Sequence, residues 1–202
     1  MLPFFLKRMI NHIEGKLVEK NPTYAIIDCG GVGYMLSISL HTYSRIGDNE
    51  KCKLFTHLAI REDAHVLYGF FDTDERATFL QLISVSGVGA TTARMILSSL
   101  TPSEIRQAIA AGNVGQLKSI KGIGEKTAQR IIVDLAGKMG ETANVSSNFL
   151  GEHNKIKAES LIALVNLGFA KQGAEKAIEK AIKDDPKEKT VEQLIKDALK
   201  NL

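Results

Sequence analysis

An internal repeat constrains the fold of this chain more than any other feature of its sequence. When residues 82–100 are laid over residues 117–135, eight of the nineteen aligned positions are identical. The identical residues, each matched 35 positions later, are Leu82, Ser84, Gly87, Gly89, Thr92, Ala93, Ile96 and Leu100. Apolar residues recur at spacings of three and four around a Gly-x-Gly sequence in both copies, which predicts two helices joined by a tight turn.

The two Gly-x-Gly sequences, Gly87-Val88-Gly89 and Gly122-Ile123-Gly124, predict a particular kind of turn. Glycine adopts a positive φ and lets a ligand approach the backbone, while the apolar residue between the glycines can fill the core. The following helix begins with unpaired N–H groups at the positive end of its dipole, which favours an anion. Hydroxyl and basic side chains flank the turns: Thr92, Lys118, Lys121, Lys126, Thr127 and Arg130. The pattern predicts a site for nucleic-acid phosphates that does not read the bases.

Two nucleotide-binding interpretations fail on spacing. The run Gly122-Ile123-Gly124-Glu125-Lys126-Thr127 lacks the adjacent Gly-Lys-Ser/Thr of a phosphate-binding loop and its preceding glycine. A dinucleotide fingerprint requires a strand before the glycines, whereas a helix is predicted here. A single Gly-x-Gly between helices is most simply interpreted as a turn, but two copies with matched flanks favour contact with nucleic acid. We therefore expect no cofactor.

The N-terminal third has the period of a β structure. Residues 9–71 are rich in β-branched residues and are interrupted by turn-forming Gly, Asn and Pro. They predict five strands, at about 10–19, 23–29, 33–40, 51–61 and 64–71. Five short strands with frequent turns favour a small OB-like barrel. Residues 1–8 precede the pattern and are interpreted as an extension, with translation starting at either Met1 or Met9.

The rest of the chain is predicted to be helical in two parts. Within residues 72–140, Thr101-Pro102-Ser103-Glu104 has the pattern of a capping box with Pro at the first helical position. Residues 141–154 are polar without a clear period and predict a flexible linker. The remaining segment, residues 155–202, predicts three short helices at about 155–166, 171–183 and 190–201. The predicted fold class is multidomain β + α: a five-stranded OB-fold barrel over 1–71, an all-α domain over 72–140 and a three-helix C-terminal domain.

Composition and charge exclude several classes of protein. No stretch approaches the roughly 20 consecutive apolar residues of a membrane-spanning helix. Two cysteines in 202 residues, Cys29 and Cys52, rule out a disulfide framework and favour free thiols in a reducing cytosol. The net charge is only +3, and the segments 1–71, 72–150 and 151–202 each carry one more basic than acidic residue. Binding to nucleic acid must therefore depend on local geometry rather than on bulk charge.

In combination, these features resemble the RuvA family of Holliday-junction-binding proteins. Besides the duplicated helix-hairpin-helix unit, the match rests on Gly30-Gly31-Val32-Gly33-Tyr34, residues 56–64 and Leu67-Tyr68-Gly69-Phe70, and it covers Met9 to Leu202. The resemblance implies a cytoplasmic bacterial subunit without catalytic residues, which serves the ATPase motor RuvB in branch migration. It also implies a homotetramer that holds a four-way DNA junction open, as one tetramer or as two that sandwich the junction, with RuvC resolvase as a further partner.

The resemblance also assigns roles to residues. Both hairpins, around the four turn glycines, would contact phosphates on the minor-groove side of a junction arm. Glu62 and Asp63 resemble an acidic pin that repels phosphates at the strand crossover. The UBA-like C-terminal domain would contact RuvB through Leu164, Leu167, Phe169 and Leu199, although an apolar stripe on a helix more often belongs to the core, so burial of some of them stays open. The sequence departs from the family at Ala90-Thr91, where Pro-Lys is common, and at Glu125, where a basic residue is common.

Two functions of other classes stay open at this point. Glu62 and Asp63 could bind Mg²⁺ with another carboxylate in a junction nuclease, although without the resemblance they are most simply interpreted as a solvated turn. The chain could also be a scaffold that acts only through its C-terminal helices. Other enzymatic chemistry has little support, because the five histidines show no metal-ligand or catalytic-triad spacing.

Overall fold

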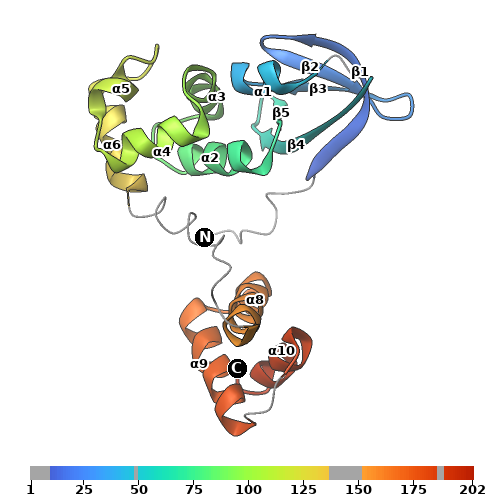
Figure 1. Cartoon of the computed structure of the whole chain (residues 1–202), viewed down its shortest axis with the longest axis vertical. Coiled ribbons are helices and arrows are strands. Elements are labelled where there is room, and N and C mark those ends of the chain that lie inside the picture. The colour runs from blue at the N-terminus through green and yellow to red at the C-terminus, as the bar shows by residue number, and fades with distance from the viewer. Residues whose placement is uncertain (1–9, 48–49, 137–151, 186–188) are drawn as a thin grey trace. The chain divides into compact units, whose positions relative to one another are not determined.

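The computed structural model describes residues 10–47, 50–136, 152–185 and 189–202, which fall into two compact units. The first unit comprises residues 10–136 and the second residues 152–202 (Figure 1). Within these ranges, no helix has the length and apolar character needed to cross a membrane. The predicted extension and most of the predicted linker lie outside the described residues. Residues 152–154 of that linker belong instead to a helix.

Five strands form a closed barrel in the first unit. They are β1 (His12–Asn21), β2 (Tyr24–Asp28), β3 (Gly33–Ser37), β4 (Lys51–Ile60) and β5 (His65–Phe70). Their order is β1-β2-β3-β5-β4, with β1 paired to β4, and only the short β3–β5 pairing is parallel. Alternate side chains point inward and form the barrel core, which includes Ile13, Ala25, Ile27, Leu36 and Leu54. The predicted OB-type barrel is confirmed.

The third strand is shorter than predicted. The sequence predicts a strand over 33–40, but β3 ends at Ser37 and a short helix, α1 (Leu40–Arg45), follows. Ser39 is the N-cap of α1, because its hydroxyl accepts a hydrogen bond from the Thr42 N–H at 3.0 Å. Tertiary contacts of Ser39 and Thr42 with the helical part of the unit stabilise this helix.

Helices continue the first unit after the barrel. They are α2 (Thr73–Ile83), α3 (Ala90–Ser99), α4 (Pro102–Ala110), α5 (Val114–Lys118) and α6 (Glu125–Leu135). The predicted capping box is present, since the Glu104 carboxylate accepts the Thr101 N–H at 2.7 Å and the Thr101 hydroxyl accepts the Glu104 N–H at 3.3 Å. Rings of β5 reach into the helical core: Tyr68 and Phe70 lie 5.2 and 4.8 Å from Phe79 between ring centroids. One core therefore joins β5 to the helices.

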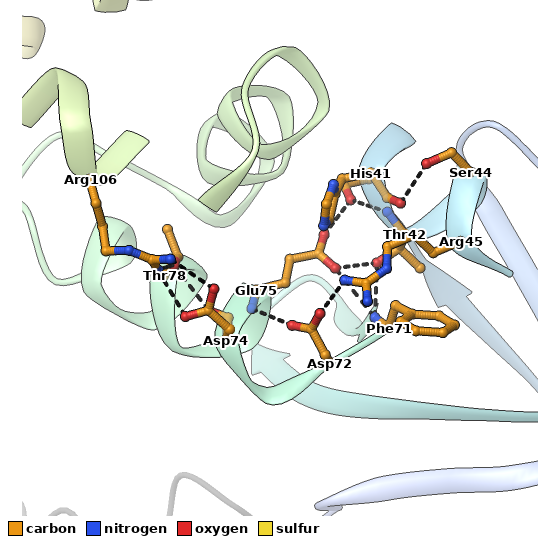
Figure 2. Close-up of polar contacts among 11 residues, drawn as sticks. His41, Thr42, Ser44, Arg45, Phe71, Asp72, Asp74, Glu75, Thr78 and Arg106 are labelled. Atoms are coloured by element: carbon orange, nitrogen blue, oxygen red, sulfur yellow. Dashed lines mark hydrogen bonds and ion pairs between the residues drawn. The ribbon is translucent and has the colours of Figure 1, made fainter. Parts of the chain in front are cut away.

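A buried carboxylate connects α2 to the barrel (Figure 2). The side chain of Glu75 is fully buried and accepts hydrogen bonds from the hydroxyls of Ser39 and Thr42. It also accepts the Phe71 N–H at 3.3 Å. Because Ser39 and Thr42 belong to the start of α1, these bonds fix the first turn of α2 against that helix.

Two ion pairs flank this buried group (Figure 2). Asp72 caps α2 and pairs with Arg45 of α1. Partial burial raises the pKa of Asp72, but the N–H of Glu75 and the Arg45 guanidinium outweigh it, and the net pKa is lowered. On the other side, Arg106 of α4 donates to both carboxylate oxygens of Asp74, at 2.8 and 3.0 Å. The helix α2 is thus held at its start by α1 and by α4.

The second unit is the three-helix domain that the sequence predicts. It comprises α8 (Glu152–Asn166), α9 (Lys171–Asp184) and α10 (Val191–Leu199). Its core includes Leu164, Ala174, Ile178, Leu194 and Ala198. Lys189 joins the end of α9 to α10, since its Nζ lies 3.0 Å from the Ala181 carbonyl and 2.9 Å from the Asp197 carboxylate.

Candidate nucleic-acid interface

The two sequence repeats form hairpins with matched backbone geometry. The first hairpin is α2, residues 84–89 and α3; the second is α5, residues 119–124 and α6. The first glycine of each turn has a positive φ, 90° at Gly87 and 87° at Gly122. One residue later, the N–H of Val88 or Ile123 donates to the carbonyl three residues back, at 3.0 and 3.1 Å. Val88 and Ile123 are both buried, which confirms the predicted apolar filling of each turn.

The second glycine of each turn does not use a positive φ. Gly89 and Gly124 have φ values of −84° and −81°, and the positive φ expected in each turn lies at Gly87 and Gly122. A Cβ added at either position would meet no atom within 4 Å. Neither backbone strain nor packing within the described part of the unit therefore requires glycine there. Because glycine has no side chain, the space over the first turn of each following helix stays open.

These two glycines are also N-caps without a side chain. Gly89 and Gly124 precede α3 and α6, and neither helix has a side-chain cap. The other helices of this unit, α1, α2, α4 and α5, are capped by Ser39, Asp72, Thr101 and Asn113. The first N–H groups of a helix lack intrahelical partners. Each hairpin therefore presents an exposed helix N-terminus that can accept an anion.

The predicted basic residues all lie on the second hairpin and are exposed. Lys118 is paired with Glu125 at 3.0 Å, and Arg130 with Asp134 at 3.7 Å. Within the described residues, Lys121 and Lys126 have no such ion pair. The hydroxyl residues of the two hairpins, Thr92 and Thr127, are half-buried in the first turns of α3 and α6. The structure therefore gathers the predicted residues around two turns, with the charge at only one of them.

The acidic pair belongs to the barrel and to neither hairpin. Glu62 and Asp63 are exposed on the turn between β4 and β5, which the Arg61 N–H closes by donating to the Ala64 carbonyl at 2.9 Å. Among the described residues, no group of three or more His, Cys, Asp or Glu side chains could hold a metal ion. Nothing in this geometry supports the junction-nuclease alternative.

The predicted partner surface of the C-terminal unit requires one correction. Leu167, Phe169 and Leu199 are exposed, but Leu164 is fully buried in the three-helix core and cannot contact a partner there. Apolar residues occur on more than one face of α8. Their spacing alone therefore did not distinguish core residues from surface residues. Exposed apolar residues that sequence reasoning missed in this unit are Ile162, Val165 and Leu202.

The fold and the paired hairpins define the class of this protein: a DNA-binding protein with tandem helix-hairpin-helix units attached to an OB-type barrel. Family models match three consecutive segments: RuvA N terminal domain at residues 9–69, SAM-like helix-hairpin-helix tandem at 79–136 and RuvA, C-terminal domain at 155–202. The chain belongs to the RuvA family.

Curated relatives match along nearly the whole chain. A protein of Christiangramia forsetii and one of Flavobacterium psychrophilum are each 52% identical over 194 residues, which is 96% of this chain and 100% of the relative. A Bacteroides fragilis protein is 48% identical over 202 residues, with the same coverage. All three carry the name Holliday junction branch migration complex subunit RuvA.

Proposed function

We propose that this chain binds four-way DNA junctions by their shape and holds their arms open for branch migration in recombination and repair. The observation that carries the proposal is the duplicated hairpin, with an exposed, uncapped helix N-terminus behind each glycine turn. Membership of the RuvA family along nearly the whole chain supports the junction as the DNA substrate. The chain itself supplies binding, and the ATP-driven motor is a separate protein, RuvB.

Each chain binds one junction arm with both hairpins. Helix N–H groups at the starts of α3 and α6 donate hydrogen bonds to two phosphates, and the hydroxyls of Thr92 and Thr127 add donors. Such contacts fix the position of the duplex but carry no sequence information. Both hairpins belong to one core, so the separation of the two phosphate contacts is fixed. The arm is therefore recognised by geometry.

Four copies complete the site, because a four-way junction presents four equivalent arms. Closed rotational symmetry is the usual arrangement of homo-oligomers. The barrel exposes Val18, Met35 and Ile60, each about 60% exposed, and a contact between copies would remove such apolar side chains from water. One tetramer or two facing tetramers can then hold the junction.

Glu62 and Asp63 act near the crossover as a repelling group. Both carboxylates are exposed at the tip of the β4–β5 turn. In a tetramer, four such turns at the centre bring like charges close to DNA phosphates, and the repulsion increases as water is excluded. Strands that exchange partners are thereby kept apart.

The C-terminal unit binds the motor. Leu167, Phe169 and Leu199 give it an exposed apolar surface that suits a helical partner. A RuvB hexamer is the proposed partner, RuvC resolvase is a further one, and the complex acts in the bacterial cytoplasm.

The test is a gel-shift comparison of a labelled four-way junction with a linear duplex of the same arm sequence, followed by sedimentation of the complex. We expect a strong preference for the junction and four or eight chains per junction, without cleavage when Mg²⁺ is added. Equal affinity for both DNAs would reject the proposed function.

A further inference from the structure

The two hairpins carry different charges although their backbones match. The basic residues of the second hairpin are Lys118, Lys121, Lys126 and Arg130, and the residues 35 positions earlier are Ile83, Ser86, Thr91 and Met95. In the first repeat, residues 82–100, the one basic side chain is Arg94, whose Nη1 donates to the Thr23 carbonyl of the barrel at 2.9 Å. Most of the basic charge that could bind DNA phosphates therefore lies on the second hairpin.

An ion pair crosses the turn of that second hairpin. Lys118 is the last residue of α5, Glu125 is the first residue of α6, and their charged atoms are 3.0 Å apart. Both side chains are more than half exposed, at 55% and 59%. The pair thus lies in solvent at the same helix N-terminus that the proposed function assigns to phosphate.

The turn does not need this ion pair in order to form. In the first hairpin, Ile83 and Ala90 occupy the matched positions, and the backbone of the turn has the same positive φ and the same hydrogen bond. Exposed pairs of this kind contribute little to stability. The effect of Glu125 is therefore on the charge available at the binding surface.

We infer that Glu125 is an internal competitor for DNA phosphate, which occupies Lys118 and so weakens the grip of the second hairpin. This inference rests on the proposed function. For Lys118 to contact DNA, it must exchange a carboxylate for a phosphate, and Glu125 then remains beside a like charge. Lys121 and Lys126 are left as the lysines of this hairpin that bind phosphate without such an exchange.

The test uses Glu125→Gln in the full chain, with fluorescence anisotropy of the labelled four-way junction and of the matching duplex over a series of salt concentrations. We expect binding to be tighter at low salt by about two- to fivefold for each chain that contacts the DNA, the range expected for one exposed ion pair. The slope of log K against log salt concentration should steepen by about 0.9 per chain, because one more lysine releases a counterion. Unchanged affinity and slope would overturn the inference.

A second variant distinguishes competition from simple repulsion. Lys118→Gln alone should weaken binding, because it leaves the Glu125 carboxylate unpaired beside the phosphate. In the Lys118→Gln background, Glu125→Gln should still relieve this repulsion but should not steepen the salt slope and should gain less affinity, because no lysine is released. An equal gain in both backgrounds would mean that Glu125 only repels DNA, and the competitor role would be wrong.

The matched control is Glu192→Gln on α10. It removes the same charge from another exposed Glu–Lys pair, with Lys196, in the C-terminal unit. We expect no change in affinity or slope. If the unaltered chain does not prefer the junction, the proposed function is wrong. If the unaltered chain prefers the junction and the Glu125→Gln variant has the same affinity and salt slope, only the competitor role is wrong.

Discussion

At the scale of single residues, the informative positions are glycines whose own conformation does not require glycine. Gly89 and Gly124 have ordinary φ values and open space where a side chain would lie. A residue with a polar side chain would cap α3 or α6 better than glycine does. The sequence forgoes this stabilisation at two matched positions, which supports a role for the uncovered N–H groups outside the chain.

Replacing Gly89 and Gly124 by Asn should therefore change stability and DNA binding in opposite directions. The Asn side-chain oxygen accepts the N–H groups at the helix start, so the chain should gain a few tenths of a kcal/mol. The same bond removes the donors proposed for phosphate, and junction affinity should fall at least about tenfold, as expected when two charge-assisted hydrogen bonds are lost. Urea unfolding and anisotropy measure the two effects; unchanged binding would exclude these turns as the contact.

The acidic pair calls for a different substitution. Glu62→Gln combined with Asp63→Asn removes two exposed charges and should leave the fold unaffected. Junction affinity should stay equal or rise, while the preference over duplex falls, because repulsion at the crossover is lost. Competition between a labelled junction and unlabelled duplex measures the ratio. An unchanged preference would argue against a pin.

At the scale of elements, the connection of α1 to α2 depends on a buried acceptor. Glu75→Ala leaves the Ser39 and Thr42 hydroxyls and the Phe71 N–H without their shared partner, and it should cost about 2–4 kcal/mol. Asp74→Ala is the control on the same helix, since its pair with Arg106 is exposed and should cost less than about 1 kcal/mol. Urea unfolding followed by circular dichroism compares them. Equal losses of unfolding free energy in the two variants would show that the buried position of Glu75 adds nothing to stability.

The contacts of Asp197, which help to join α9 to α10, make the stability of the C-terminal unit depend on pH. Hydrogen bonds from Lys189 and Lys200 lower the pKa of Asp197 below its ordinary value of 3.8. A lowered folded-state pKa means that the contribution of Asp197 to stability is complete above about pH 4 and is lost as the pH falls through the folded value. Asp197→Asn should lack this part of the acid dependence. The NMR titration of the Asp197 carboxyl checks the direction, and an ordinary or raised pKa would contradict it.

Sequence reasoning predicted elements with strong periodicity and failed where tertiary contacts decide. The repeat identified both hairpins, and alternation identified the barrel strands, because these patterns report local geometry. The helix α1 was missed, because the hydroxyls of Ser39 and Thr42 at its start donate to Glu75, which lies more than thirty residues later in the sequence. The exposure of Leu164 was also misjudged, because the spacing on α8 does not say which apolar stripe faces α9 and α10. The pairing of Lys118 with Glu125 required the turn geometry.

At the scale of the whole molecule, the proposed DNA binding and the proposed partner binding belong to separate units. Deleting residues 141–202 removes the C-terminal unit and leaves intact every contact described in residues 10–136. The shortened chain should bind the junction within about twofold of the full chain, because its hairpins are unchanged, and it should no longer stimulate the RuvB ATPase. Anisotropy and an ATPase assay on junction DNA test both. Loss of junction binding would support a scaffold that acts through its C-terminal helices.

The core that runs from β5 into the helices has a mechanical consequence. Tyr68 and Phe70 pack their rings against Phe79, and Glu75 bonds α2 to α1, so β5 and the helices of both hairpins share one core. In the proposed complex, a DNA arm bound by the hairpins would not tilt without turning its barrel. If four subunits are joined in a ring through their barrels, a tilt of one DNA arm would turn its barrel. The turned barrel would then exert a torque on its neighbours and so on the other three arms. The junction would open or close as a unit, without any signal passing through the DNA.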